Sequence, residues 1–111
     1  MADSIKVLGQ ASPAATTAID LYVVPAEAQA TISSITVCNT GSSPVTIRIS
    51  VAVANAADST KQYIYYDYVI GAKDTLLVVI GITLNETDRV RVYASATDVA
   101  FNIFGVETSR E

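Results

Sequence analysis

Apolar and polar residues alternate with a period of two along several stretches of this chain. The clearest stretch covers residues 45–54, where the even-numbered residues are polar or small and are predicted to face outward. The inward residues are expected to be Val45, Ile47, Ile49, Val51 and Val53. Residues 89–94 repeat this pattern, with their even-numbered residues expected inward. No stretch has the spacing of an amphipathic helix, so the alternation predicts strands.

Turn signals separate the expected strands. Pro25 ends one strand, because proline cannot donate a hydrogen bond to a β-ladder. Residues 39–44 (NTGSSP) form a clear turn cluster. The expected strands cover residues 5–8, 21–24, 30–38, 45–54, 63–70, 75–84, 89–94 and 99–106.

The composition agrees with this pattern. Val (14), Ile (11) and Thr (12) make up a third of the 111 residues, whereas Leu (5) and Lys (3), which fill helical bundles, are scarce. The sequence therefore predicts an all-β fold, a single antiparallel β-sandwich of seven to eight strands. The strand number favours a jelly-roll-like arrangement, although alternation alone leaves a barrel or an immunoglobulin-like topology open. We expect an N-terminal strand and arm over residues 1–17, the sandwich over 18–107 and a tail over 108–111.

The charge balance disfavours a protein that binds nucleic acid. The seven Lys and Arg residues are dispersed and outnumbered by eleven Asp and Glu, whereas binding a phosphate backbone needs clustered basic side chains. The first nine residues lack the apolar segment of a secretory signal, and the longest apolar run, residues 76–82, is too short to span a membrane. We therefore expect no nucleic-acid or membrane partner, and synthesis in a cytoplasm.

Residue types that carry catalysis or bind metals are scarce. The chain has no His, the usual base beside a nucleophilic serine, and the single Cys38 excludes both an intrachain disulfide and a cysteine metal cluster. The carboxylates match no calcium-loop spacing, and the five isolated glycines form no phosphate-binding loop. The sequence predicts no enzyme, no metal and no cofactor.

Four of the six tyrosines fall within residues 63–68. On a regular strand, Tyr63 and Tyr65 share one face with Asp67, and Tyr66 and Tyr68 share the other. One face must contribute to the core. The second is either also buried, or exposed as an interface or a sugar-binding surface.

Residues 76–82 are apolar on both faces of their expected strand. A strand with one face in water should carry polar residues on that face, and an exposed apolar strand is an aggregation hazard. The second face is therefore expected to be covered, either by a loop of the same chain or by another subunit. We favour another subunit, which predicts a homo-oligomer.

Segments along nearly the whole chain together carry a resemblance to a known family. They are Lys6-Val7-Leu8-Gly9-Gln10, Leu21-Tyr22 with Val24-Pro25-Ala26, Ile35-Thr36-Val37-Cys38-Asn39, Tyr63-Ile64-Tyr65-Tyr66-Asp67, Asp74-Thr75, Gly81-Ile82-Thr83-Leu84, Asp88 with Val90 and Val92-Tyr93, and Phe101-Asn102 with Phe104-Gly105. In this order they resemble a family of small all-β structural proteins of tailed-phage virions. The resemblance implies a symmetric multimer without enzymatic activity or cofactor, and it transfers no ligand-binding residues.

The first functional hypothesis is a capsid decoration, or cement, protein that stabilises the phage head by bridging capsomers. It implies a homotrimer bound to the major capsid protein or to other virion proteins, located in the virion and made in the bacterial host's cytoplasm. The contact residues expected from the tyrosine segment and the apolar run are Tyr63, Tyr65, Leu77 and Val79. Leu8 and Pro13 are added because the N-terminal arm could reach across a neighbour or the capsid shell. The alternatives are a tail, neck or baseplate component and a module that binds host glycans through the tyrosine segment.

Overall fold

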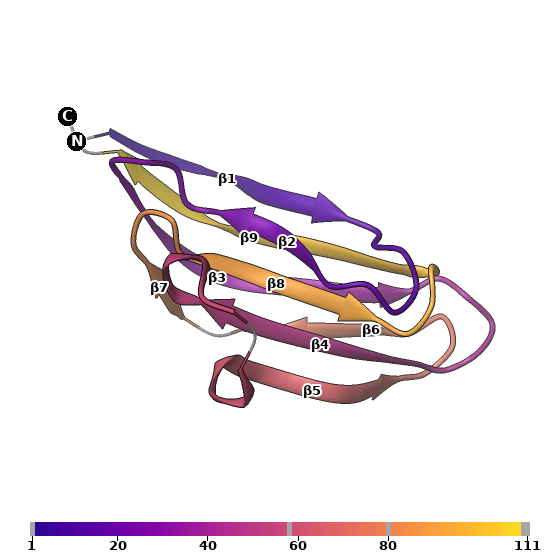
Figure 1. Cartoon of the computed structure of the whole chain (residues 1–111). Coiled ribbons are helices and arrows are strands. Elements are labelled where there is room, and N and C mark those ends of the chain that lie inside the picture. The colour runs from indigo at the N-terminus through magenta and orange to yellow at the C-terminus, as the bar shows by residue number, and fades with distance from the viewer. Residues whose placement is uncertain (1, 58, 80, 110–111) are drawn as a thin grey trace.

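Two antiparallel sheets pack face to face in the computed structural model, which describes residues 2–57, 59–79 and 81–109 (Figure 1). The first sheet has the order β1-β9-β3-β6, with β7 also paired to β3, and the second has the order β2-β8-β4-β5. The strands of the first sheet are β1 (Ala2–Ala11), β9 (Val99–Ser109), β3 (Ala28–Asn39), β6 (Thr75–Val78) and β7 (Ile82–Leu84). Those of the second are β2 (Ile19–Val23), β8 (Arg89–Ala94), β4 (Val45–Ala52) and β5 (Tyr63–Ile70).

Each sheet interleaves strands from the two halves of the chain, and most successive strands lie in opposite sheets. If β6 and β7 are counted as two pieces of one strand, eight strands form two four-stranded sheets in the arrangement of a jelly roll. The predicted fold class, an all-β antiparallel sandwich of jelly-roll type, is confirmed.

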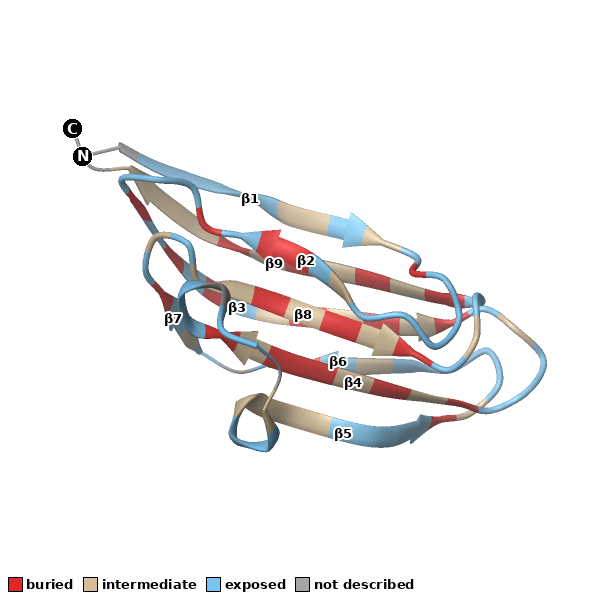
Figure 2. Ribbon diagram, viewed as in Figure 1, coloured by how far each residue is buried: buried red, intermediate tan, exposed pale blue. Residues whose placement is uncertain are grey.

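The core lies between the sheets. Figure 2 shows buried residues at alternate positions along β8 and β9, as the period of two requires. The side chains of Phe101, Ile103 and Ile35 from the first sheet, among others, are fully buried against those of the second. Burying one such side chain contributes about 1.5–3 kcal/mol relative to leaving it in water. The partners from the second sheet include Ile47, Ile49, Val90 and Val92.

The predicted alternation is confirmed in β8 and in most of β4. In β8, the inward residues Val90, Val92 and Ala94 are buried. In β4, the predicted alternation of burial holds from Val45 to Ile49. Beyond it Val51, predicted inward, is half-buried, and Ala52, predicted outward, is fully buried. The chain then leaves the sheet for a short 3₁₀ turn, η1 (Val53–Asn55). Val53, predicted to point inward, is 65% exposed. The left-handed backbone of Ala54 (φ 51°) interrupts the extended conformation that the alternation assumed.

Only β5 and β8 have the predicted bounds at both ends, and the largest differences concern β1, β9 and the expected strand over residues 75–84. The β1 strand runs to Ala11 and β9 to Ser109, because these two strands pair from Ala2 opposite Ser109 to Ala11 opposite Phe101. Backbone pairing of this kind needs no apolar side chains, so hydrophobic pattern alone did not find it. The expected strand over residues 75–84 is divided, so the described residues form nine strands rather than seven or eight. Gly81, a residue that weakens strands, lies in the break.

The segment after β1, predicted to be part of an arm, lies against its own sandwich. The backbone N–H of Thr16 donates to the carbonyl of Ala94 (2.8 Å), and the Ser12 hydroxyl donates to the carbonyl of Thr97 (3.1 Å). Pro13 between them is buried. These contacts close one end of the sandwich over the end of β8.

A buried asparagine joins the turns at that same end. The Nδ2 group of Asn39 donates to the carbonyls of Ser43 (2.8 Å), Ile70 (3.2 Å) and Gly71 (3.1 Å), and its Oδ1 accepts from the Gly41 N–H (3.0 Å). One side chain thus satisfies backbone groups of the turn after β3 and of the turn after β5.

Candidate functional site

The outer face of the first sheet carries exposed apolar side chains on β6. Leu77 is 60% exposed, and Val79, just after the strand, is 74% exposed. Their neighbour Val78 points the other way and is buried in the core. No loop among the described residues covers Leu77 or Val79. Of the two covers predicted for this face, a loop of the same chain is therefore excluded for these two residues.

A second apolar surface lies on the same sheet at the β1 edge. Ile5 (85% exposed) pairs with Val106, and Val7 (48% exposed) pairs with Phe104, so the four side chains share one face. Together with Lys6, Ser33 and Gly105, they line a shallow hollow. Sequence reasoning missed this surface. The alternation of Ile5 and Val7 is visible in the sequence, but their partners lie about a hundred residues away.

The tyrosine segment forms β5, the edge strand of the second sheet, and its faces differ from the prediction. Tyr65 pairs with Ile49 and Tyr68 with Ile47, so three steps along β5 match two steps along β4. The extra residue makes a β-bulge, in which Asp67 adopts a left-handed conformation (φ 51°).

The bulge changes which tyrosine rings lie beside one another. Tyr63 packs edge-on against Tyr66 (ring centroids 4.8 Å apart), and Tyr65 packs in the same way against Tyr68 (5.1 Å). The predicted grouping of Tyr63 with Tyr65 was wrong for a second reason of the same kind. Tyr63 pairs with Ser50 and Tyr65 with Ile49, so two steps along β5 match one step along β4 and the two rings face opposite sides.

Arg48 of β4 stands at the centre of the outer face of the second sheet. Its Nε donates to Asp67 Oδ1 (2.6 Å), and its guanidinium carbon lies 4.5 Å from the ring centroid of Tyr66 and 4.3 Å from that of Tyr93. The hydrogen bond to Asp67 is the main cause that raises the pKa of Arg48 above its ordinary value. The guanidinium therefore remains charged and is held by one carboxylate and two aromatic rings.

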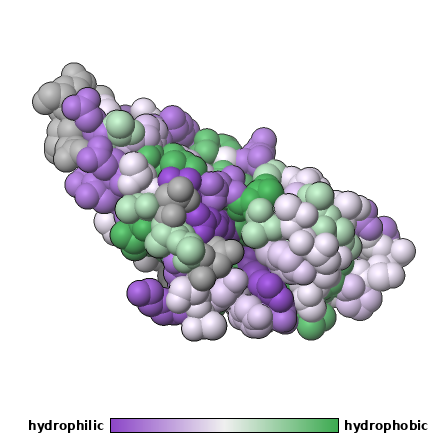
Figure 3. Space-filling model, in the orientation of Figure 1, coloured by the Kyte–Doolittle hydropathy of each residue, from purple (hydrophilic) through white to green (hydrophobic). Residues whose placement is uncertain are grey.

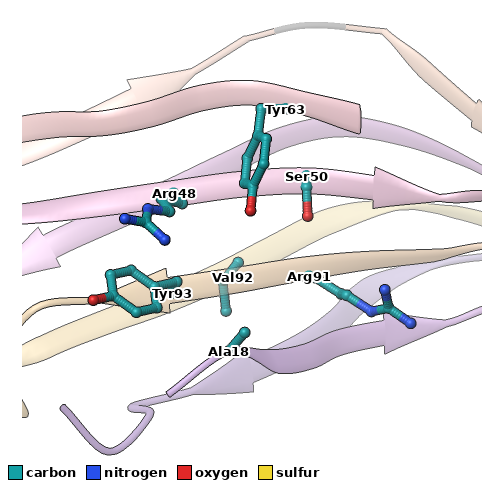
Figure 4. Close-up of a pocket in the computed structure, with 7 residues that line it drawn as sticks. All are labelled: Ala18, Arg48, Ser50, Tyr63, Arg91, Val92 and Tyr93. Carbon is teal, nitrogen blue, oxygen red and sulfur yellow. The ribbon is translucent and has the colours of Figure 1, made fainter. Parts of the chain in front are cut away.

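A small hollow lies beside this cluster (Figure 4). Tyr63 of β5 reaches across β4 beside Ser50, while Arg48 and Tyr93 lie on one side of the hollow and Arg91 on the other. Ser50 points outward as predicted, but it is only 4% exposed because neighbouring side chains cover it. The residues that line the hollow are Ala18, Arg48, Ser50, Tyr63, Arg91, Val92 and Tyr93.

A second ionic group lies on the same face next to β2. The carboxylate of Asp20 accepts hydrogen bonds from Arg89 Nη1 (3.1 Å) and Arg91 Nε (3.0 Å). Arg91 also donates to the carbonyl of Ala56 (2.8 Å) in the loop after η1. The arginines on this face are thus paired with Asp20 and Asp67. This pairing disfavours binding to the phosphate backbone of a nucleic acid.

Figure 3 shows the same pattern at the surface, with hydrophilic side chains running between hydrophobic areas on this side of the molecule. Across residues 2–57, 59–79 and 81–109, no three His, Cys, Asp or Glu side chains come together as metal ligands would. A search of the same residues for a helix able to cross a membrane found none.

The six predicted contact residues are divided between different parts of the molecule. Leu77 and Val79 are exposed on the first sheet, whereas Tyr63 and Tyr65 are half-buried on the edge of the second. The remaining two are less accessible, since Leu8 is half-buried on β1 and Pro13 is buried. The structure therefore does not bring the six together into one surface.

Comparison with known proteins gives a likeness of fold. No family model matches the chain, and no curated protein matches it. Among solved structures, a protein of Bacillus endospore appendages, described as a novel family of disulfide-linked pili, matches 99% of this chain and 88% of its own (TM-score 0.54, 15% identity). A chain from infectious bursal disease virus, Gx strain, matches 96% of this chain (TM-score 0.55, 11% identity), and this chain spans 32% of the viral one.

The chain shares its fold with a pilus protein and a virus protein. A pentameric capsid protein isolated from metagenomic phage sequences also matches, at TM-score 0.44 and 9% identity over 93% of this chain and 60% of its own. At these identities the matches describe architecture and assign no activity.

Proposed function

We propose that this protein is a structural component of a tailed-phage virion, and specifically a capsid decoration protein that stabilises the head by bridging capsomers. The observation that carries the proposal is the uncovered apolar surface of the first sheet, with Leu77 60% and Val79 74% exposed. Exposed apolar clusters of this kind mark protein–protein interfaces, because leaving them in water is unfavourable. The sequence resemblance to phage virion proteins and the fold shared with a virus protein support the same conclusion.

The two apolar surfaces of the first sheet suit two different partners. The β6 surface, Leu77 and Val79, is the proposed contact between sister subunits of a homotrimer. The β1 surface, around Ile5 and Val7, is the proposed contact with the major capsid protein. Each contact stabilises the shell in proportion to the apolar area it removes from water, at about 25 cal/mol per Å², and the many copies on one head add their contributions.

A tail, neck or baseplate component remains the alternative, because it would use the same surfaces in a smaller symmetric assembly. The two roles differ in the number of copies in each particle. A decoration protein occupies every equivalent site of the shell, on the order of hundreds of copies, whereas a tail ring holds a small multiple of three or six.

The test is the copy number of this chain in purified virions of the phage that encodes it, measured by quantitative mass spectrometry against the major capsid protein. We expect on the order of hundreds of copies per particle. A small multiple of three or six would replace the decoration role with the tail, neck or baseplate role. Absence from purified particles, with particles from a gene-deleted phage as the blank, would overturn a virion role altogether.

A further inference from the structure

An exposed aromatic ring lies at the centre of the polar cluster on the second sheet. Tyr66 is 57% exposed and stands on the bulge of the edge strand β5. The edge-on contact with Tyr63 (4.8 Å between centroids) supports its ring, and the guanidinium of Arg48 lies 4.5 Å from its centroid.

Polar groups with unused bonding capacity lie beside this ring. Among the described residues, Arg48 donates a hydrogen bond only through Nε, so its two Nη groups keep their donors. Asp67 accepts that bond at Oδ1, which leaves Oδ2 as an acceptor on a side chain that is 44% exposed. An acceptor and several donors therefore lie next to an aromatic residue that is 57% exposed, although the Arg48 guanidinium lies over one face of its ring.

This combination suits a pyranose sugar. One face of such a ring presents C–H bonds, whose partial positive charge is attracted to the negative face of an aromatic ring. Its hydroxyls both donate and accept hydrogen bonds, as a neighbouring carboxylate and guanidinium require. Because the charges of Arg48 and Asp67 cancel, the cluster favours a neutral sugar over an anionic one.

The cluster is also held in place before any ligand arrives. Arg48 comes from β4, which is paired on both sides, with β5 and with β8. Its guanidinium contacts Tyr93 (4.3 Å to the ring centroid) as well as Tyr66 and Asp67. Fixed side chains lose little conformational entropy on binding, which favours even a shallow site.

We propose that Tyr66, Arg48 and Asp67 form a binding site for a neutral pyranose unit of a cell-surface polysaccharide. The site is open and has a single exposed ring at its centre, so affinity for one sugar is expected to be weak, with a Kd on the order of millimolar. A particle that carries many copies gains avidity from simultaneous contacts. The activity is additional to the virion role and uses the sheet opposite the proposed assembly surfaces.

The test is saturation-transfer NMR on the purified full chain with glucose, galactose, mannose and N-acetylglucosamine as separate probes. We expect at least one of them to bind through its C–H face. Tyr66→Ala should weaken that binding at least tenfold. Tyr68→Ala is the matched control, because Tyr68 lies on the same strand, is 44% exposed and packs edge-on against a tyrosine, yet its ring contact is to Tyr65 and not to Arg48.

A second variant tests the polar half of the site without disturbing the bulge. Asp67→Asn removes the carboxylate, and asparagine tolerates the left-handed backbone at this position. We expect it to weaken sugar binding while leaving the unfolding midpoint nearly unchanged.

The proposal is overturned if none of the four sugars binds, or if Tyr66→Ala binds as well as Tyr68→Ala. Either result would leave the virion proposal untouched, because that proposal depends on the copy number in particles. Conversely, absence from virions would not affect a measured sugar affinity.

Discussion

At the scale of single residues, Tyr22 and Glu107 connect the two sheets. Tyr22 on β2 is 8% exposed, and its hydroxyl donates to Glu107 Oε2 on β9 (2.6 Å). Burial is the main cause that raises the pKa of Tyr22 well above its ordinary value of 10.0, and the hydrogen bond and negative charge of Glu107 act in the same direction. Glu107 is in turn paired with Lys6 Nζ (3.3 Å).

This arrangement predicts a loss of stability in alkali. Above pH 10 the unfolded chain releases the Tyr22 proton while the folded chain keeps it, so the unfolded state binds fewer protons and the free energy of unfolding falls as pH rises. The contribution is complete below about pH 9 and decreases above pH 10 by up to about 1.4 kcal/mol per pH unit. The free energy of unfolding, obtained from urea unfolding curves between pH 8 and pH 11, measures this decrease.

Tyr22→Phe isolates this contribution. The variant should be less stable than the wild type by about 1.5–3 kcal/mol near neutral pH, since it lacks a hydrogen bond to a charged group. That difference should shrink above pH 10, whereas Tyr68→Phe, at an exposed position, should follow the wild type throughout. Parallel curves for wild type and Tyr22→Phe up to pH 11 would contradict the argument.

At the scale of elements, the pairing of β9 with β3 depends on one glycine. Gly105 lies on β9, between β1 and β3, and a Cβ at this position would meet the carbonyl oxygen of Thr31 and the Cα of Ile32. These are backbone atoms of the neighbouring strand, which cannot rotate away as the end of a side chain can.

We therefore expect Gly105→Ala to destabilise the protein by about 1–3 kcal/mol, the usual effect of overpacking. The matched control is Gly71→Ala, because a Cβ there meets nothing within 4 Å. Chemical unfolding of the two variants measures the difference. Equal stability of the two would show that β9 and β3 can separate without loss.

At the same scale, two register shifts in β5, one of them the bulge at Asp67, explain why the tyrosine faces were predicted wrongly. A period of two assigns faces only while each residue of one strand matches one residue of its partner. In β5 the rule is broken twice, between the pairs Tyr63–Ser50 and Tyr65–Ile49 and between Tyr65–Ile49 and Tyr68–Ile47. Nothing in the local sequence marks Asp67 as the bulged residue, because the bulge is a property of the pairing with β4.

At the scale of the whole molecule, the open β6 surface predicts self-association. We expect light scattering coupled to size-exclusion chromatography to give a multimer, and a trimer under the decoration proposal. Replacing both Leu77 and Val79 with Lys should reduce the mass toward that of the 11.7 kDa chain, because charged groups would have to be buried in the contact.

Val69→Lys is the matched control for this experiment. Val69 is 61% exposed, like Leu77, but lies on β5 of the other sheet. Its replacement should leave the mass of the multimer unchanged. A wild-type mass near 11.7 kDa would contradict self-association of the free protein and restrict the β6 contact to the assembled particle.

The sequence by itself determined the class of fold and most of the strands. Alternation and turn residues are local signals, since a side chain's face follows from its own strand and a turn from its own backbone preferences. They located β5 and β8 with their observed bounds and identified the inward residues of β4 up to Ile49. They also identified Leu77 as apolar on a face that should be polar.

Only the tertiary structure decided which residues act together. Ile5 and Val7 meet Val106 and Phe104 because the two ends of the chain pair, and Arg48 meets Tyr66 and Tyr93 because three strands lie side by side. Such neighbours are fixed by strand order and register, which arise from packing the whole chain. A period of two indicates toward which side of its strand a residue points, but only the fold determines which residues it contacts.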